Sequence, residues 1–358
     1  MPHRILSVNP GSTSTKIAVY DDEDQVLVKT IDHPQDELEC FSDILLQFEY
    51  RRDHVLKTLS EEGVELAELS AVVGRGGLLP PVKAGGYLVG QDMLDELRSG
   101  DLQPHASNLG AIIAHSIAEP LGINAYIYDA VSSDELNDIA RITGIPEVKR
   151  QSYCHVLNAK ATARKVAVSL GKSYDECNFI VAHIGGGISI SAHEKGRIVD
   201  VITDDAGPFS PERAGSVPLG YIIDICYNGG YTEKELNTKL KKNSGIKGYL
   251  GTNDCREVER MIADGDELAA KIYEAQAFQI AKGIGEKGAV LCGDVDAVIL
   301  TGGMAYSKYI TGEVTRRVGY LAPVVVMPGE NEMESLSLGT LRILRGEEMP
   351  SEYRRSSQ

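Results

Sequence analysis

Two short turns, rich in glycine and small hydroxyl side chains, have the composition of a phosphate-binding site. The first turn is Asn9-Pro-Gly-Ser-Thr-Ser-Thr-Lys16, and it joins an apolar run, Ile5–Val8, to a second expected strand, Lys16–Tyr20. Free amides, hydroxyls and one ammonium group in a tight strand–turn–strand unit are the donors that phosphate oxygens need, and Gly11 lets another group approach the backbone. Taken alone, the segment is equally consistent with an ordinary polar hairpin turn.

The second half of the chain repeats this pattern. The segment Phe179-Ile-Val-Ala-His-Ile-Gly-Gly-Gly-Ile-Ser-Ile-Ser-Ala-His193 is again an apolar strand, a glycine turn and a strand. An offset of 174 residues (183 − 9) places Asn9 on His183, and it also places Gly11 on Gly185. Two similar halves indicate a duplicated domain with a ligand cleft between the copies, although two such hairpins can also resemble each other by chance.

The elements around both turns alternate between strands and helices, which predicts an α/β fold. Expected strands are 25–31, 71–77, 125–128, 197–201, 297–303 and 323–327. Expected helices are 37–62, 91–99, 108–118, 134–142, 156–170, 216–227, 232–240, 266–291 and 335–345. Ligands of such sheets bind beyond the carboxyl ends of the strands. Arg75 and Asp129 are expected at two of these ends.

Composition excludes several classes of protein. The length of 358 residues fits two domains, and 42% hydrophobic with 25% charged residues is ordinary for a globular protein. No apolar run is long enough for a membrane span, and no signal-peptide core begins the chain, so we expect no membrane partner. The six scattered cysteines favour a reducing cytoplasm and no zinc site, and the net charge of −16 disfavours nucleic acid.

Two familiar nucleotide-binding motifs are missing from the sequence. No G-x-G-x-x-G follows a strand, because the glycines at 185–187 continue into Ile188-Ser189. Gly171-Lys172-Ser173 resembles the end of a Walker A loop, but Val166 stands where its first glycine must be. The chain is therefore predicted to be neither a Rossmann dehydrogenase nor a P-loop kinase.

The two turns resemble the phosphate-loop motifs of the acetate and butyrate kinase family. The likeness continues through six further segments: Tyr128-Asp129, Tyr153-Cys-His155, Pro211-Glu-Arg-Ala-Gly215, Gly251-Thr-Asn-Asp-Cys-Arg256, Leu300-Thr-Gly-Gly303 and Asn331-Glu332. It therefore covers nearly the whole chain. Within the family, the first turn, Gly74-Arg-Gly-Gly77 and Pro211–Gly215 look like the butyrate kinase branch.

The resemblance implies a duplicated two-domain ribonuclease H-like (actin-like ATPase) α/β fold with a central interdomain cleft. The expected domains are 1–153 with 334–358, whose last helix returns to the N-terminal domain, and 154–333, which binds nucleotide. The implied reaction is the reversible, Mg²⁺-dependent transfer of a phosphoryl group between ATP and a short-chain carboxylate, giving ADP and an acyl phosphate. The resemblance also implies a cytoplasmic homodimer or larger homo-oligomer.

The resemblance also assigns site residues by motif. Asn9, Arg75, Asp129, His155 and Arg213 are expected to act on the carboxylate and the phosphoryl group in transfer. Asp129, Glu332 and Asn9 are expected to hold Mg²⁺, directly or through water. The expected nucleotide-binding residues are Ser12, Ser14, Lys16, His183, Gly185, Gly186, Gly187, Asp254, Arg256, Gly302 and Gly303.

Some of these assignments have alternatives. Acetate kinases place their second arginine three residues before a His-Gly-Gly sequence. In this chain that arginine position is Val72, and Arg75 stands at the histidine position. Arg75 therefore either replaces the lost charge or binds the carboxylate. Glu334 competes with Glu332 for the metal role. His105 is a further weak candidate, from a segment like the family's His/Asn stretch. A thiol nucleophile at Cys154 lacks an apparent acid or amide partner.

Ordinary structural roles also fit several of the selected residues. His183 could be a satisfied core histidine, Asp129 could cap the following segment, and Arg213 could form a solvated ion pair of little energetic value. An acetate or propionate kinase is the alternative within the family, because one methylene group in the acyl pocket is worth only about 1–3 kcal/mol. A non-catalytic nucleotide switch is the alternative from another class.

Overall fold

The computed structural model describes residues 2–203 and 205–355, and the chain forms two compact units. Unit 1 comprises Met1–Asp134 and Asn331–Gln358, and unit 2 comprises Glu135–Glu330. The change of unit after Asp134 comes earlier than the expected boundary at 153. The reason is that residues 135–153 bond to unit 2: the Asn137 N–H donates to the Val199 carbonyl, and Arg150 forms an ion pair with Asp200.

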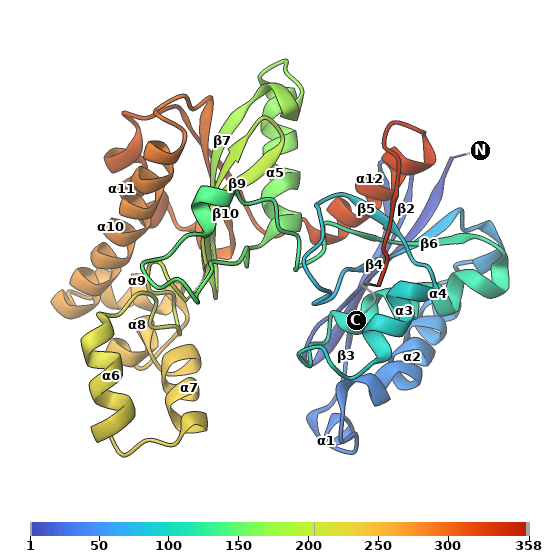
Figure 1. The fold of residues 1–358 in the computed structure, drawn as a ribbon, viewed down its shortest axis with the longest axis horizontal. Helices are drawn as coiled ribbons and strands as arrows, with labels where there is room; N and C mark the ends of the chain where they lie inside the picture. The colour runs from blue at the N-terminus through green and yellow to red at the C-terminus, as the bar shows by residue number, and fades with distance from the viewer. Residues whose placement is uncertain (1, 204, 356–358) are drawn as a thin grey trace. The chain divides into compact units, whose positions relative to one another are not determined.

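Unit 1 contains a seven-stranded sheet in the order β12-β5-β6-β4-β1-β2-β3 (Figure 1). The strands are β1 Arg4–Pro10, β2 Ser14–Asp21, β3 Asp24–Asp32, β4 Ala71–Arg75, β5 Gly86–Leu88, β6 Asn124–Tyr128 and β12 Ser351–Glu352. The helices are α1 Gln35–Leu38, α2 Phe48–Glu61, α3 Gln91–Arg98, α4 Asn108–Ala118 and α12 Glu332–Leu344. Helix α12 covers one face, and α4, packed with α2 and α3, covers the other.

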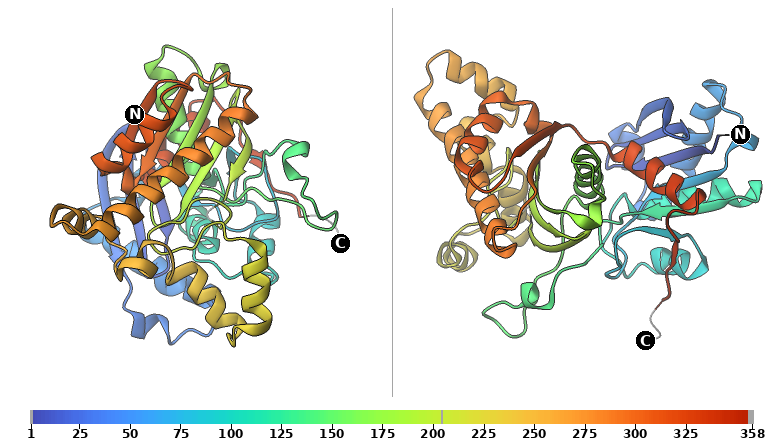
Figure 2. Two further views of the ribbon diagram at one scale, coloured as in Figure 1. Left: turned by 90° about the vertical axis from the view of Figure 1, so that its left-hand side faces the viewer. Right: turned by 90° about the horizontal axis from the view of Figure 1, so that it is seen from above.

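Unit 2 contains a five-stranded sheet in the order β11-β10-β7-β8-β9. The strands are β7 Asn178–Ile184, β8 Ile188–Glu194, β9 Arg197–Ile202, β10 Ala297–Gly302 and β11 Val324–Pro328. The helices are α5 Val156–Ser169, α6 Leu219–Asn228, α7 Glu233–Lys242, α8 Gly245–Leu250, α9 Cys255–Ala263, α10 Glu267–Val290 and α11 Lys308–Val318. Helix α5 packs on one face, and α10 with α11 packs on the other (Figure 2).

The two sheets repeat one arrangement. In each, an antiparallel meander, β3-β2-β1 or β9-β8-β7, is extended by a parallel strand, β4 or β10, beside its first strand. The first strands also keep the offset seen in the sequence, since Arg4 and Asn178, which begin them, are 174 residues apart (178 − 4). The prediction of a duplicated α/β fold is confirmed.

Three predicted helices differ from the structure. The helix expected over 37–62 is interrupted, because α1 ends at Leu38, a 3₁₀ turn spans Ile44–Gln47 and α2 begins only at Phe48. The helix expected over 134–142 is wrong, because only a 3₁₀ turn, Asp138–Arg141, forms there. Backbone N–H groups in this segment are already bonded elsewhere: that of Asp134 donates to the Val82 carbonyl, as that of Asn137 does to Val199. The terminal helix begins at Glu332 rather than at 335, which places the Glu332 carboxylate in the first helical turn.

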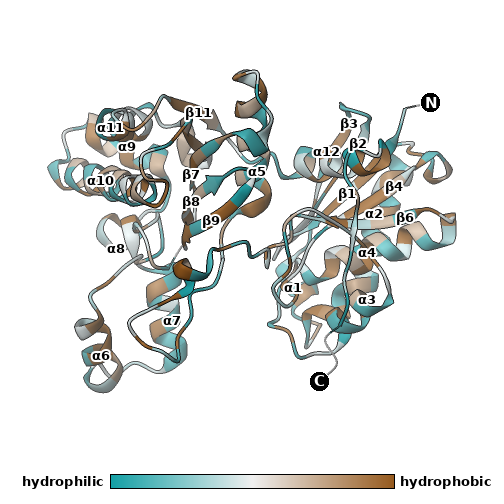
Figure 3. Ribbon diagram, turned by 45° about the horizontal axis from the view of Figure 1, so that its top comes forward, coloured by the Kyte–Doolittle hydropathy of each residue, from teal (hydrophilic) through white to brown (hydrophobic). Residues whose placement is uncertain are grey.

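Both units have a buried apolar core between the sheet and its helices. Most helices carry hydrophilic and hydrophobic residues side by side, as the mixed colours along α10 and α4 show (Figure 3). In residues 2–203 and 205–355, none of the helices combines the length with the apolar character that crossing a bilayer requires.

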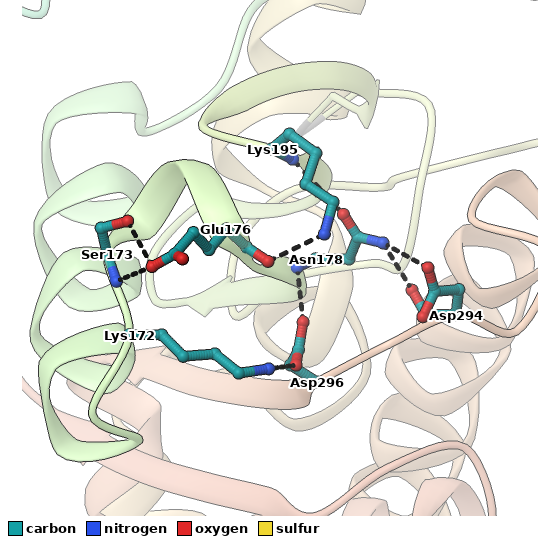
Figure 4. Close-up of polar contacts among 7 residues, drawn as sticks. All are labelled: Lys172, Ser173, Glu176, Asn178, Lys195, Asp294 and Asp296. Carbon is teal, nitrogen blue, oxygen red and sulfur yellow. Dashed lines mark hydrogen bonds and ion pairs between the residues drawn. The ribbon is translucent and has the colours of Figure 1, made fainter.

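A polar cluster fixes the edge of the second sheet where β7 and β10 begin (Figure 4). The Asp296 carboxylate accepts from Lys172 Nζ at 2.6 Å and from the Asn178 backbone N–H at 2.8 Å. Ser173 and Glu176 form a capping box on the 3₁₀ turn Tyr174–Glu176. Lys172 thus helps to anchor the start of β7 through Asp296, and Ser173 caps the 3₁₀ turn that precedes β7.

Candidate active site

Three selected residues of unit 1 lie at the carboxyl ends of neighbouring parallel strands. Asn9 is near the end of β1, Arg75 ends β4 and Asp129 directly follows β6, and β4 pairs in parallel with both β1 and β6. Neighbouring strands are about 4.8 Å apart, so these side chains come from one edge of the sheet. This edge is where α/β sheets bind ligands.

Asn9, Arg75 and Glu332 contact one another. Asn9 Nδ2 donates to Glu332 Oε2 at 2.6 Å, Arg75 Nη1 lies 3.0 Å from Glu332 Oε1, and Arg75 also donates to Asn9 Oδ1 at 3.4 Å. Glu332 is brought there by the first turn of α12, a position that favours a negative charge. The other candidate, Glu334, instead lies by Tyr20. Burial of the Tyr20 phenol, and to a smaller extent the negative charge of Glu334, raise its pKa to about 12.

Asp129 is held rigidly at its strand end. Its side chain is buried, and its backbone φ is +43°. The Asp129 carboxylate accepts the Gly85 N–H at 2.8 Å, and the Asp129 N–H donates to the Gly85 carbonyl at 3.0 Å. A left-handed conformation is rare outside glycine, and such strain is concentrated at functional sites. The carboxylate is therefore fixed in direction, as a ligand-binding group needs to be.

The first turn presents polar groups outward. Ser12 is exposed, Ser14 is half-buried at the start of β2, and the Gly11 N–H closes the turn on the Ser14 carbonyl at 2.7 Å. Lys16 pairs with Asn9 across the β1–β2 ladder, which puts the two side chains on the same face of the sheet. The structure thus groups hydroxyl, amide and ammonium donors around one turn.

In unit 2, two histidines stack near the glycine turn. The rings of His155 and His183 are 3.7 Å apart and nearly parallel, with an interplanar angle of 7°. His155 Nδ1 lies 2.9 Å from Ser189 Oγ, and His183 pairs with Ser189 in the β7–β8 ladder. Both predicted histidines are therefore brought together, one from the start of α5 and one from the end of β7.

Buried neighbours set the proton position on His183. Asn158 Nδ2 lies 3.0 Å from His183 Nδ1 and 3.1 Å from Thr301 Oγ1, and all three side chains are buried. With the amide nitrogen donating, Nδ1 is the acceptor, and the proton sits on Nε2. His183 Nε2 lies 3.4 Å from a Glu330 carboxylate oxygen. The ring consequently presents an N–H donor toward the turn that follows β7.

The glycines of unit 2 make room at the same edge. Gly302 has φ +90°, and a Cβ there would lie 2.5 Å from the Ile184 carbonyl oxygen, so only glycine fits. Gly186 has no atom within 4 Å of its Cβ position, which leaves space beside the turn, and Gly185 and Gly187 close that turn with one hydrogen bond. Gly303, which follows β10, is equally unobstructed.

Arg213 is tied to this glycine turn through Ser210. Ser210 Oγ donates to the Gly186 carbonyl at 2.6 Å and accepts from the Arg213 N–H at 3.2 Å. Burial lowers the pKa of the Arg213 guanidinium, which nevertheless stays charged because an arginine pKa is so high. The predicted phosphoryl-binding arginine and the predicted second loop therefore belong to one hydrogen-bonded group.

Asp254 and Arg256 form a local pair at the start of α9. Asp254 caps the helix by accepting the Arg256 N–H at 2.9 Å, and the Arg256 guanidinium binds both of its carboxylate oxygens. Hydrogen bonds from Arg256 lower the pKa of Asp254 to about 2. The Arg256 side chain is highly exposed, so the contact is consistent with a helix cap, and the nucleotide role of the pair stays a prediction.

Sequence reasoning missed three polar partners, Asn158, Ser189 and Glu330. Asn158 lies one helical turn after His155, and Ser189 follows the three glycines; both spacings are visible in the sequence. Glu330 precedes the selected Asn331-Glu332 pair. Burial, and then the positive charge of Arg75, lower the pKa of the weak candidate His105. Its Nδ1 accepts the Ser107 N–H at 3.2 Å.

The carboxylates of Asp129 and Glu332 have the donor chemistry that magnesium prefers, without forming a dedicated protein cage. Within residues 2–203 and 205–355, no three or more His, Cys, Asp or Glu side chains gather as a metal-binding group. Asp129 follows β6, and Glu332, in the first turn of α12, contacts Asn9 near the end of β1; their side chains offer hard oxygen ligands. Magnesium commonly takes one or two carboxylates and completes its shell with water and substrate phosphates, so this donor set suits it.

Known proteins share this fold. Residues 148–322, which lie within unit 2, match the model described as the Acetokinase family. An acetate kinase from Porphyromonas gingivalis aligns with a TM-score of 0.78 and 20% identity over 96% of this chain and 100% of its own. A propionate kinase from Francisella tularensis aligns with a TM-score of 0.74 and 20% identity over 94% of this chain and 98% of its own.

A more distant structure extends the comparison beyond these kinases. A ROK family protein from Streptococcus pneumoniae, solved in complex with sucrose, aligns with a TM-score of 0.51 and 12% identity over 96% of this chain and 100% of its own. The chain therefore has the two-domain α/β fold that these solved structures share, in agreement with the predicted fold class.

Proposed function

We propose that this chain belongs to the acetokinase family over its whole length and phosphorylates a short-chain carboxylate with ATP. The proposed substrate is butyrate or a branched analogue, and the products are the acyl phosphate and ADP, formed reversibly by direct in-line transfer. The observation that carries the proposal is the contact of Arg75 with Asn9 and Glu332 at the carboxyl edge of the first sheet. The family match of residues 148–322 supports it from the other unit.

The chemistry asks for positive charge rather than for a base. A carboxylate is ionised at neutral pH, so it can attack phosphorus without losing a proton. The difficulty lies in bringing two anions together and in stabilising the oxygens of the phosphoryl group in flight. We assign that work to Arg75 in unit 1 and to Arg213, His155 and the Nε2–H of His183 in unit 2.

The nucleotide phosphates are assigned to the two turns. In unit 1, Ser12, Ser14 and Lys16 offer hydroxyl and ammonium donors; in unit 2, the glycines at 185–187 leave their backbone open to close approach. Asp254, Arg256, Gly302 and Gly303 are assigned to the nucleoside, as the sequence resemblance implies.

Magnesium is assigned to Asp129 and Glu332, with Asn9 beside them. When bound, the ion would neutralise charge on the nucleotide phosphates and orient them. The contribution of the chain is to fix the carboxylates: Gly85 holds Asp129, and Asn9 with Arg75 holds Glu332. Since carboxylates have further lone pairs, these contacts are compatible with a metal ligand role.

Arg213→Ala tests the proposed mechanism in the purified protein. With MgATP and butyrate, loss of a group that stabilises transferring charge should lower kcat on the order of 10²-fold or more while ATP still binds. Arg316→Ala is the matched control, because Arg316 is an exposed helix arginine paired with Glu313. Near-normal turnover of Arg213→Ala would remove this residue from the mechanism.

The acid preference separates the proposal from its alternatives. The value of kcat/KM is to be measured for acetate, propionate, butyrate, isobutyrate, isovalerate and valerate. A maximum at four or five carbons supports a butyrate-type kinase, whereas a maximum at acetate or propionate assigns the chain to those kinases. ATP binding without product from any acid would indicate the non-catalytic nucleotide switch. Light scattering tests the proposed homodimer or larger homo-oligomer.

A further inference from the structure

A buried arginine lies directly behind the first turn. Arg51, on α2, has no exposed surface, and its guanidinium reaches back to the segment that joins β1 to β2. Nη1 donates to the carbonyl oxygens of Gly11 at 2.9 Å and Ser14 at 3.2 Å, and Nη2 donates to that of Ser12 at 2.9 Å. One side chain therefore binds three carbonyl groups of a four-residue turn.

The remaining carbonyl of the turn also points inward. The Thr13 oxygen accepts the His33 backbone N–H at 2.8 Å. With the carbonyls of residues 11–14 all bound, the amides of Ser12 and Thr13 are left without an acceptor in the parts of the chain that the structure describes. Both residues are exposed. Arg51 thus gives the turn a polarity, with oxygens toward the core and N–H groups toward solvent, which suits an anion.

The charge of Arg51 has no neutralising partner. Its remaining hydrogen bonds go to the neutral Gln47, whose Oε1 accepts from Nε at 3.0 Å and from Nη2 at 2.9 Å, and to Thr15 Oγ1. Across residues 2–203 and 205–355, no carboxylate forms an ion pair with Arg51. Burial lowers the pKa of Arg51, and an unpaired buried cation is costly to a fold. A bound anion on the outer side of the turn would offset that cost.

We propose that Arg51 is the positioning residue of the first turn, and that its buried charge makes this turn of unit 1 a binding site for the oxygens of a phosphoryl group. Arg51 does not touch the ligand; it orients the amides that do and adds a positive potential behind them. The identity of the phosphoryl group as that of ATP or the acyl phosphate rests on the proposed function.

The most selective test changes the partner of Arg51 rather than Arg51 itself. Gln47→Glu keeps the arginine and its bonds to the turn but neutralises its charge with an adjacent carboxylate. The probe is inorganic phosphate, with the shift of the melting temperature and isothermal titration as the readouts. We expect phosphate to bind on the order of 10-fold more weakly to this variant, with no loss of stability in the absence of phosphate.

Three arginine variants complete the design. Arg51→Gln should lose the phosphate-induced shift and raise KM for ATP at least 10-fold, since the turn is then neither oriented nor charged. Arg51→Lys keeps the charge without the fork, so it should retain more phosphate affinity than Arg51→Gln. Arg52→Gln is the control, because the neighbouring Arg52 pairs with Asp53 and stacks on Phe48 instead of binding the turn.

The outcomes separate this inference from the proposed function. If Gln47→Glu and Arg51→Gln bind phosphate as the unaltered chain does, the inference is overturned, even where Arg51→Gln is less stable. If Arg51→Gln does not fold, Gln47→Glu alone decides. If phosphate binding depends on Arg51 while no acid is phosphorylated, the anion site stands and the carboxylate kinase proposal fails.

Discussion

Replacing Asn158 with alanine should destabilise unit 2 and slow catalysis at the same time. Asn158 is 1% exposed and supplies hydrogen bonds to His183 and Thr301, which are also buried. Alanine leaves the His183 Nδ1 acceptor without a partner, at a cost of about 1–3 kcal/mol. Thr301 keeps its bond to the Gly329 carbonyl, so most of the cost falls on the histidine.

The expected size of this effect is measurable in two ways. A loss of about 2 kcal/mol corresponds to a decrease in Tm of about 4–8 °C for a unit of roughly 200 residues, which calorimetry resolves. An imidazole that is no longer held in one orientation should also lower kcat by about 10–100-fold. Asn228→Ala is the control, because Asn228 lies on the exposed α6 and its side chain bonds the exposed Asp224 one helical turn earlier.

The reasoning about His183 is refuted by one combination of results. If Asn158→Ala melts within 1 °C of the unaltered chain, on the order of measurement error, and keeps its kcat, the Asn158 hydrogen bond does not hold the His183 ring. A stability loss without a change in kcat would instead confine Asn158 to the core and remove His183 from the mechanism.

Three further effects follow from the described contacts. Gly302→Ala should cost about 2–3 kcal/mol in thermal unfolding because of its +90° φ and the close carbonyl, whereas Gly303→Ala should be nearly neutral. Burial is the main cause that lowers the pKa of His33 to about 4, so the unfolded chain binds a proton at this residue at a higher pH than the folded chain does. The free energy of unfolding in urea should therefore decrease by about 3 kcal/mol as pH falls from 6.5 to 4, and His33→Gln should remove this decrease. Lys287→Met should lower the free energy of unfolding, measured in urea, by about 3 kcal/mol, because it removes a buried partner of the Asp200 carboxylate.

Local sequence patterns predicted the elements that carry the site, because those elements satisfy their own requirements. The apolar run before Asn9 and the glycines at 185–187 define strand ends that need only a buried sheet and a tight turn. The capping box of Thr232 and Glu235 likewise begins α7 where the sequence places it. In such segments, local preference and tertiary packing favour the same structure.

Other features depended on contacts between distant residues and could not be predicted. The segment after Ser133 has a helical pattern, but its N–H groups bond residues 82 and 199, which outweighs local preference. The role of Arg51 is invisible in the sequence, since an arginine on an amphipathic helix is usually solvated. The tautomer of His183 is set by Asn158, 25 residues earlier in the chain.

The direct measurement of the proposed activity is phosphorus NMR of the purified chain with MgATP and butyrate. A butyrate kinase should produce butyryl phosphate and ADP in equal amounts, and hydroxylamine should then convert the acyl phosphate to a hydroxamate. Release of inorganic phosphate without an acyl phosphate resonance would contradict transfer to a carboxylate, and so would unchanged ATP under conditions in which the nucleotide is bound.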